Sequence, residues 1–174
     1  SKENITSLSE EYSELGSKAS FVSEFVRFHP LLENHKGLED IYEVLELGGT
    51  ISLDLSSEDA IISNMTSQSR NKIRKAKTYG VEVFWGRSRE LLRKLKSLYK
   101  ETMDKNKADD YYYFQPSFFD SIFQDLKYNF LVFYSVFEGN IIAMCIVLFS
   151  NGQMHYHICG ADKEYLQFAP TNLL

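Results

Sequence analysis

Two short turn sequences near the C-terminal end constrain the fold more than any other feature of this chain. Glu138-Gly139-Asn140 and Asn151-Gly152 separate three apolar segments, which are residues 130–137, 141–149 and 153–159. Asn-Gly is the dipeptide that most readily adopts the two positive φ angles of a tight hairpin turn. The three segments are therefore predicted to be consecutive strands of an antiparallel meander.

The segments just before the meander alternate in type. A strand is predicted at residues 81–85, an amphipathic helix at 88–103 and a second helix that opens at Pro116. The order of strand, helix, helix and meander predicts an α+β fold, with a mixed but largely antiparallel sheet flanked by helices.

The first third of the chain is more polar and gives weaker signals. Residues 7–20 are predicted to be a helix or a loose arm, and residues 21–28 a helix end or a strand. Residues 41–47 and 50–55 have the composition of strands joined by Gly48-Gly49. Ser56 to Asp59 has the pattern of a capping box, so one helix is predicted from there to Gly80.

Composition bounds the class of protein. The chain has 174 residues, 44% of them apolar, with thirteen Phe and eleven Tyr, which is enough for the packed core of one domain or two small ones. Its longest strongly apolar stretch, residues 141–149, is about half of what a membrane-spanning helix needs. The N-terminus is polar without an apolar signal region. We therefore expect no membrane span and a cytoplasmic location.

A run of basic residues stands against the formal net charge of −5. On a helix, Arg70, Arg74 and Lys77 fall within an arc of roughly 60° and form one ridge, whereas Lys72 and Lys75 point away from it. The ridge has two interpretations: it binds phosphate groups, or it is a solvated helix face favoured by the helix dipole. Arginine forks suit the phosphate interpretation.

Histidines alternate with a tyrosine in the last predicted strand. Because side chains alternate across a strand, His155 and His157 share one face and Tyr156 takes the other. One histidine is a candidate proton acceptor in a substrate cleft, and ordinary sheet packing is the alternative. No third ligand is evident, so no metal site is expected.

Three further positions are candidates for substrate contact. Tyr111 and Tyr113 belong to an aromatic cluster that either stacks on a base or sugar or packs in the core. Asn172, near the start of a last helical turn, either caps that turn or contacts substrate. Cys145 and Cys159 lie in predicted strands without metal-ligand spacing and are expected to be buried, reduced thiols.

Four blocks stand in order within residues 25–174. They are Phe28-His29-Pro30-Leu31-Leu32, Ser69-Arg70-Asn71-Lys72-Ile73-Arg74-Lys75-Ala76 with Gly80-Val81, His155-Tyr156-His157, and Ala169-Pro170-Thr171-Asn172-Leu173-Leu174. In this order they resemble segments of the FemAB-like family of GNAT-related acyltransferases, and the second block resembles that family's Arg-Asn-x-Ile-Arg-Lys-Ala segment.

The resemblance implies a GNAT-like fold that is C-terminally incomplete. Residues 1–80 would hold the end of a first GNAT-like subdomain with a basic connecting helix, and residues 81–174 the first part of a second subdomain, truncated before its closing strands. The chain is accordingly expected to be a piece of a longer protein.

The resemblance also implies an N-acyltransferase. Members of this family transfer an aminoacyl group from aminoacyl-tRNA to an amine of a peptidoglycan precursor, and relatives use acyl-CoA. Residues 160–165 lack the glycine spacing of a coenzyme A pyrophosphate loop, which disfavours acyl-CoA, and no cofactor is expected. Against the family pattern, Gln115 aligns where many relatives carry an arginine.

The expected roles follow from these comparisons of residues. His155 and His157 are the catalytic candidates, and the substrate-binding candidates are Arg70, Arg74, Lys77, Tyr111, Tyr113, Tyr156 and Asn172. Two alternatives stay open at this point: an acyl-CoA-dependent GNAT N-acetyltransferase, and a non-enzymatic nucleic-acid-binding or structural module.

Overall fold

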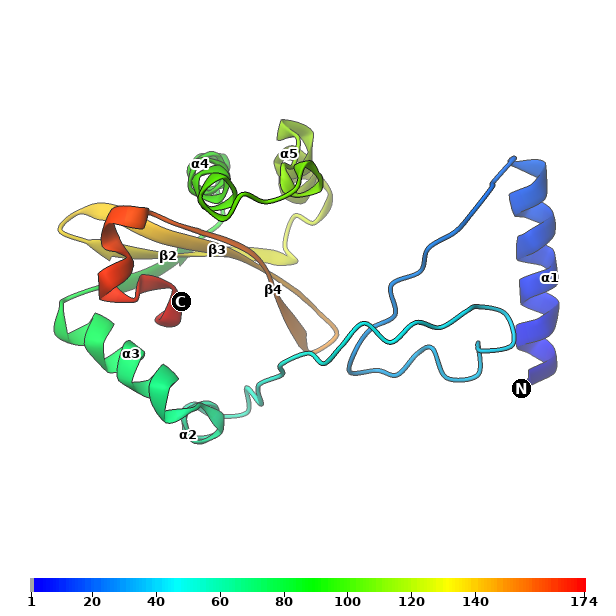
Figure 1. Ribbon diagram of the computed structural model, residues 1–174, viewed down its shortest axis with the longest axis horizontal. Helices are drawn as coiled ribbons and strands as arrows, with labels where there is room; N and C mark the ends of the chain where they lie inside the picture. Colours follow the sequence, from blue (N-terminus) through cyan, green and yellow to red (C-terminus); the bar gives the residue numbers. More distant parts are fainter. Residues whose placement is uncertain (1) are drawn as a thin grey trace. The chain divides into compact units, whose positions relative to one another are not determined.

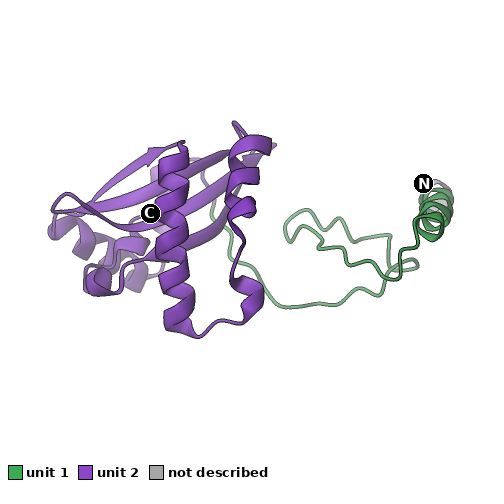
Figure 2. Cartoon of the chain, turned by 90° about the horizontal axis from the view of Figure 1, so that it is seen from above, with its two compact units in different colours: residues 1–53 green, residues 54–174 purple. Residues whose placement is uncertain are grey.

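The computed structural model describes residues 2–174, with side chains from Ile5 onward. The chain divides into two compact units, residues 1–53 and residues 54–174 (Figure 2). Each unit is described by itself.

The first unit contains one helix, α1 (Lys2–Lys18), followed by turns and extended chain. The strands predicted at residues 41–47 and 50–55 are wrong, and residues 21–28 form neither helix nor strand. Apolar composition alone does not make a strand, because its backbone groups need a paired neighbour. Leu47 and Ile51 accordingly lie exposed.

The second unit is built on a sheet whose strands follow chain order and are all antiparallel. The strands are β1 (Glu82–Gly86), β2 (Phe130–Phe137), β3 (Asn140–Ser150) and β4 (Gln153–Ala161). Both predicted hairpins are confirmed, with positive φ at Glu138 and Gly139 and at Asn151 and Gly152. The fold is α+β, as the order of elements predicts.

Two helices cover one face of this sheet, α4 (Arg89–Asn106) and α5 (Pro116–Asp125) (Figure 1). Ser88 caps α4 by accepting from the Leu91 amide, and Lys107 ends it in the left-handed region. Leucines one turn apart on α4 pack against alternate residues of the strands. The buried core includes Leu92, Leu95, Leu98, Phe119, Ile122, Phe130, Val132, Met144, Ile146 and Ile158.

The opposite face is partly covered by α3 (Ser67–Thr78) and by two 3-10 turns, η2 (Lys163–Phe168) and η3 (Pro170–Asn172). A smaller cluster of Ala76, Val81 and Ile142 joins them to the sheet, with Phe137, Tyr165, Phe168 and Leu173 around it. The buried Ser135 hydroxyl donates to the Pro170 carbonyl at 3.0 Å, which fastens the last turn to β2.

The helix predicted from Ser56 to Gly80 is in fact two helices, α2 (Glu58–Asn64) and α3. Ser57 caps α2, close to the predicted start, and Gly80 follows α3 with φ of +80° as predicted. The break lies at Thr66, whose hydroxyl accepts from the Ser69 amide and starts a second helix. A hydroxyl side chain that binds the backbone in this way competes with helix continuation.

Gly160 gives the first testable prediction. A Cβ atom at this position would overlap the α4 backbone at Leu98 and Tyr99, and backbone cannot swing aside as a side chain does. Gly160→Ala is expected to lower the free energy of unfolding, measured in urea, by about 3 kcal/mol.

Gly86→Ala is the control, because its Cβ would meet only the flexible end of Leu91, at 2.9 Å. Its loss should stay below about 1 kcal/mol. Equal losses in the two variants would contradict the close approach of α4 and β4.

Candidate active site along strand β4

A bulge interrupts β4 at the position of the histidines. Ile158 pairs with Ile146 on β3 and Tyr156 pairs with Val147, so His157 has no partner on β3. A bulge leaves one residue unpaired and re-aims its side chain. The imidazoles of His155 and His157 lie on the same face, with ring centroids 5.4 Å apart.

A series of aromatic rings packs against His157 from the helix side. The ring centroids of His157 and Phe118 of α5 are 5.9 Å apart. Phe118 stacks on Phe114 with centroids 4.3 Å apart, and Phe114 stacks on Tyr99 of α4 with centroids 5.6 Å apart. Burial among these rings lowers the pKa of His157, and the neighbouring charge of His155 lowers it further. His157 is therefore a neutral imidazole at pH 7, which is the form that accepts a proton.

Strand β4 is at the edge of the sheet, so one side of its backbone has no strand neighbour within residues 2–174. Near its end, the Ala161 amide donates to the Thr102 hydroxyl of α4 at 3.1 Å. An edge strand presents unpaired amides and carbonyls that an extended ligand can bind. A cavity of about 440 Å³ adjoins this end of β4 and is lined by Glu101, Asp104, Lys105, Ala161 and Lys163.

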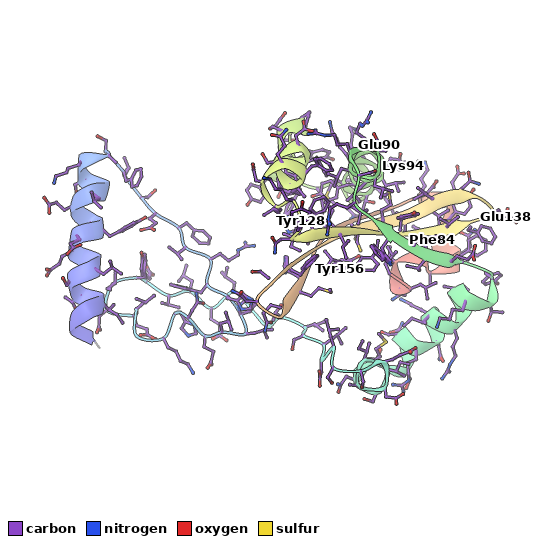
Figure 3. All side chains as sticks on the ribbon, turned by 180° about the vertical axis from the view of Figure 1, so that it is seen from behind. Phe84, Glu90, Lys94, Tyr128, Glu138 and Tyr156 are labelled. Carbon is purple, nitrogen blue, oxygen red and sulfur yellow. The ribbon has the colours of Figure 1, made fainter. Side chains whose placement is uncertain are left out.

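Tyr156 lies on the opposite side of the sheet from Glu90 and Lys94 of α4 (Figure 3). Its side chain is half exposed, while burial and the adjacent Cys159 thiol raise its pKa. Cys159 pairs with Cys145 across the strands, and both are free thiols. Burial raises the pKa of Cys145 to about 12, so that thiol is unreactive at neutral pH.

The turn after β4 is closed by its own carboxylate. Asp162 Oδ1 accepts from the Glu164 amide at 2.9 Å, and a 3-10 turn, not an α-helix, follows. The amide at the start of this turn is therefore already bound. An anion placed there would also meet the negative charge of Asp162.

The basic ridge on α3 divides into residues with different contacts. The half-buried Arg70 guanidinium donates to the carbonyls of Ile62 and Met65, at the end of α2, and to the Ser67 hydroxyl at 3.1 Å. Arg70 thus caps the C-terminus of α2. Arg74 donates to the Asn71 side chain at 3.1 Å, and Lys77 is exposed.

The other predicted contact residues are spread over three places. The Tyr113 hydroxyl donates to Asp104 at 3.0 Å, whereas Tyr111 is 79% exposed and lies edge-on to Tyr112. Asn172 is the last residue of η3, whose first residue has no side-chain cap, so the capping role predicted for Asn172 is wrong. Of the predicted residues, the structure brings together the rings of His155 and His157 on one face of β4, and Tyr156 lies on the other face.

Sequence reasoning missed three residues of this site. Phe118, Thr102 and Asp162 each contact or border the β4 edge. An aspartate directly after a strand is a recognisable turn-capping signal, because its side chain can accept from the backbone amide two residues on, as Asp162 does. Nothing in the periodicity of β4 indicates its bulge, since an extra residue leaves the composition of a strand unchanged.

The comparison with protein families assigns this domain. Residues 63–174, which contain α3, the whole sheet and both covering helices, match the family described as acetyltransferase (GNAT) domain. The chain belongs to this GNAT family. The GNAT domain supports transfer of an acyl group from a donor to an amine acceptor. No curated protein gives a significant match.

Within residues 2–174, every helix of the GNAT chain is too short or too polar to cross a membrane. Among the side chains described from Ile5 onward, no group of three or more His, Cys, Asp or Glu is placed to hold a metal ion.

The contacts of Arg70 give the second prediction. Arg70→Ala removes a charged donor from the carbonyls at the end of α2 and should lower the free energy of unfolding by about 1.5 kcal/mol. Arg74→Ala, on the same ridge, should change it by less than about 0.5 kcal/mol. Urea denaturation of both variants measures the difference, and an unchanged Arg70→Ala variant would argue against the cap.

Proposed function

We propose that this GNAT chain takes part in FemAB-like aminoacyl transfer, from aminoacyl-tRNA to an amine of a peptidoglycan precursor. The observation that carries the donor assignment is the Asp162 carboxylate bound to the Glu164 amide. Coenzyme A would need free amides for its pyrophosphate at this turn, and a fixed carboxylate opposes that binding. An aminoacyl-tRNA does not require this pyrophosphate site.

The chemistry needs little from the protein, because an aminoacyl ester is already activated. The enzyme must orient a neutral amine against the ester carbonyl, accept a proton and stabilise the oxyanion. His157 supports the proton-accepting role, since it is neutral and its ring is fixed by Phe118. In this mechanism the free backbone edge of β4 holds the reacting ester, and its unpaired amides face the oxyanion.

The remaining assignments are part of the same proposal. Residues 1–80 and 81–174 are proposed to belong to successive GNAT-like subdomains. Arg74 and Lys77 keep a phosphate-binding role in this proposal, and the exposed Tyr111 ring offers a stacking surface. Arg70 joins them only as the residue that positions their helix, because its guanidinium is bound to α2.

The donor assignment is tested by giving the chain labelled aminoacyl-tRNA with precursor, and separately acyl-CoA with amines. Transfer from aminoacyl-tRNA is expected. Asp162→Gly is expected to strengthen coenzyme A binding about tenfold, measured by calorimetry, because it frees the amide and removes a negative charge.

Glu164→Gln is the matched control, since its carboxylate does not cap the turn, and it should change coenzyme A affinity less than twofold. Transfer from acyl-CoA alone would overturn the donor assignment. It would favour the second candidate, an acyl-CoA-dependent N-acetyltransferase, to which the family description itself points.

The role of His157 predicts a pH profile. A lowered pKa means that the imidazole loses its proton below the usual value of about 6.5, so kcat/KM should rise with pH and level off before pH 7. His157→Gln should abolish this rise and lower kcat/KM about 10²-fold or more.

His155→Gln distinguishes the role of His155 from that of His157. Removing the His155 charge raises the pKa of His157, so the rise in kcat/KM should move to higher pH while the plateau stays. A profile unchanged by either substitution would exclude His157 as the proton acceptor.

A further inference from the structure

A second concave site lies between the two helices that cover the sheet. We call it the α4–α5 groove. It has a volume of about 400 Å³, which is within the range of small-ligand sites. Its lining residues are Arg89, Leu92, Arg93, Lys96, Pro116, Phe119 and Asp120, and it shares none of them with the cavity beside β4.

The cations of this groove are placed against the preferences of a helix. Arg89 is the first residue of α4, where the helix dipole disfavours positive charge, and Arg93 and Lys96 follow it on the same side. Like charges three or four residues apart also repel. The basic residues of α3 differ, because Lys75 and Lys77 lie in its last turn, where the dipole favours them.

The groove cations are only partly neutralised. Arg89 pairs with Asp120 at 3.3 Å and lies over the Phe123 ring. Arg93 pairs with Glu90 at 2.8 Å, but both side chains are 74% exposed, and such surface pairs are weak. Lys96 is half-buried and has no ion-pair partner among the residues that the structure describes.

The Lys96 side chain is partly buried, and its ammonium, which has no ion-pair partner among the described residues, is available to an anionic ligand. Among the described residues, no ion pair accounts for Lys96 beside Arg93. Departures from local preference without a structural compensation are expected at functional sites. The groove therefore has the charge of an anion site, with an apolar floor formed by Leu92 and Phe119.

The net charge of −5 does not oppose this interpretation. Ten of the 24 acidic residues precede Asp54, together with only four of the 19 basic residues. Exposed charges act over about 8 Å at physiological salt, so a ligand responds to the local surface. The charge of residues 54–174 is close to balanced, and around the groove it is positive.

We propose that the α4–α5 groove binds the phosphate groups of a nucleotide-bearing ligand. Lys96 and Arg93 hold neighbouring phosphates, and an apolar part of the ligand rests on Pro116 and Phe119. The proposed function calls for phosphate-bearing substrates, and to that extent the inference rests on it. The shared chemistry is a pair of phosphates, whether they come from a free nucleoside diphosphate or from an RNA chain.

The test measures binding to the whole chain by fluorescence anisotropy, with a labelled nucleoside diphosphate and a labelled short RNA hairpin as probes. Lys96→Ala should weaken binding of the probe that binds more tightly about tenfold. The Arg93→Ala, Lys96→Ala double variant should weaken binding of that probe further. For RNA, each lost contact should also reduce the salt slope by about one.

Lys94→Ala is the matched control, because Lys94 is the same residue type on the same helix and does not line the groove. It lies beside Glu90 on the outer surface of α4 (Figure 3). The affinity of the Lys94→Ala variant for either probe should change less than twofold. Thermal melting should show that the Lys94→Ala and Lys96→Ala variants are both folded. Equal effects of Lys94→Ala and Lys96→Ala would overturn the proposal, as would the absence of binding by either probe.

The two probes distinguish the source of the phosphates. Tighter binding of the hairpin assigns the groove to an RNA chain, and equal binding of both probes assigns it to a nucleotide. Displacement of both probes by inorganic phosphate at equal concentration would overturn a nucleotide site. Binding needs no acyl transfer, so a chain that binds in the groove but transfers only from acyl-CoA contradicts the proposed function and leaves the groove assignment standing.

Discussion

The close approach of α4 to β4 is the constraint on which the rest of the domain depends. It is possible only because Gly160 carries no side chain where the backbones of Leu98 and Tyr99 pass. This contact brings the Thr102 hydroxyl to the Ala161 amide and sets the edge strand under the helices. The ring series from Tyr99 to His157 can then span from helix to strand.

What each basic residue of this domain can bind depends on the contacts that it already makes. The most basic stretch of the sequence is on α3, yet Arg70 is used to close α2 and Lys75 lies over the Tyr79 ring. The less conspicuous cations of α4 surround a concave surface, and one of them has no partner among the described residues. The two helices therefore differ in what their positive charge is free to bind.

The sequence predicts the parts of the fold that local chemistry decides. The two hairpins and the Gly80 stop depend on single residues with strong backbone preferences, and these predictions are confirmed. The strands expected before Leu55 do not form, because strand pairing depends on partners distant in sequence. The bulge at His157 and the capping of α2 by Arg70 also depend on neighbours in space. The sequence therefore identifies His155 and His157 as candidates but does not predict the strand register that sets the direction of their side chains.

The bulge also affects which other chains can pair with β4. Within residues 2–174, one edge of the nine-residue strand β4 has no strand neighbour, and such an edge can pair with the same edge of another molecule, which is the first step of aggregation. At His157 the regular spacing of amides and carbonyls is broken and the local twist increases. A long straight strand of another molecule cannot keep its hydrogen-bond register with β4 past this point. A short ligand that spans only the irregular part is not affected. The same irregularity that presents the imidazole thus protects the edge from self-association.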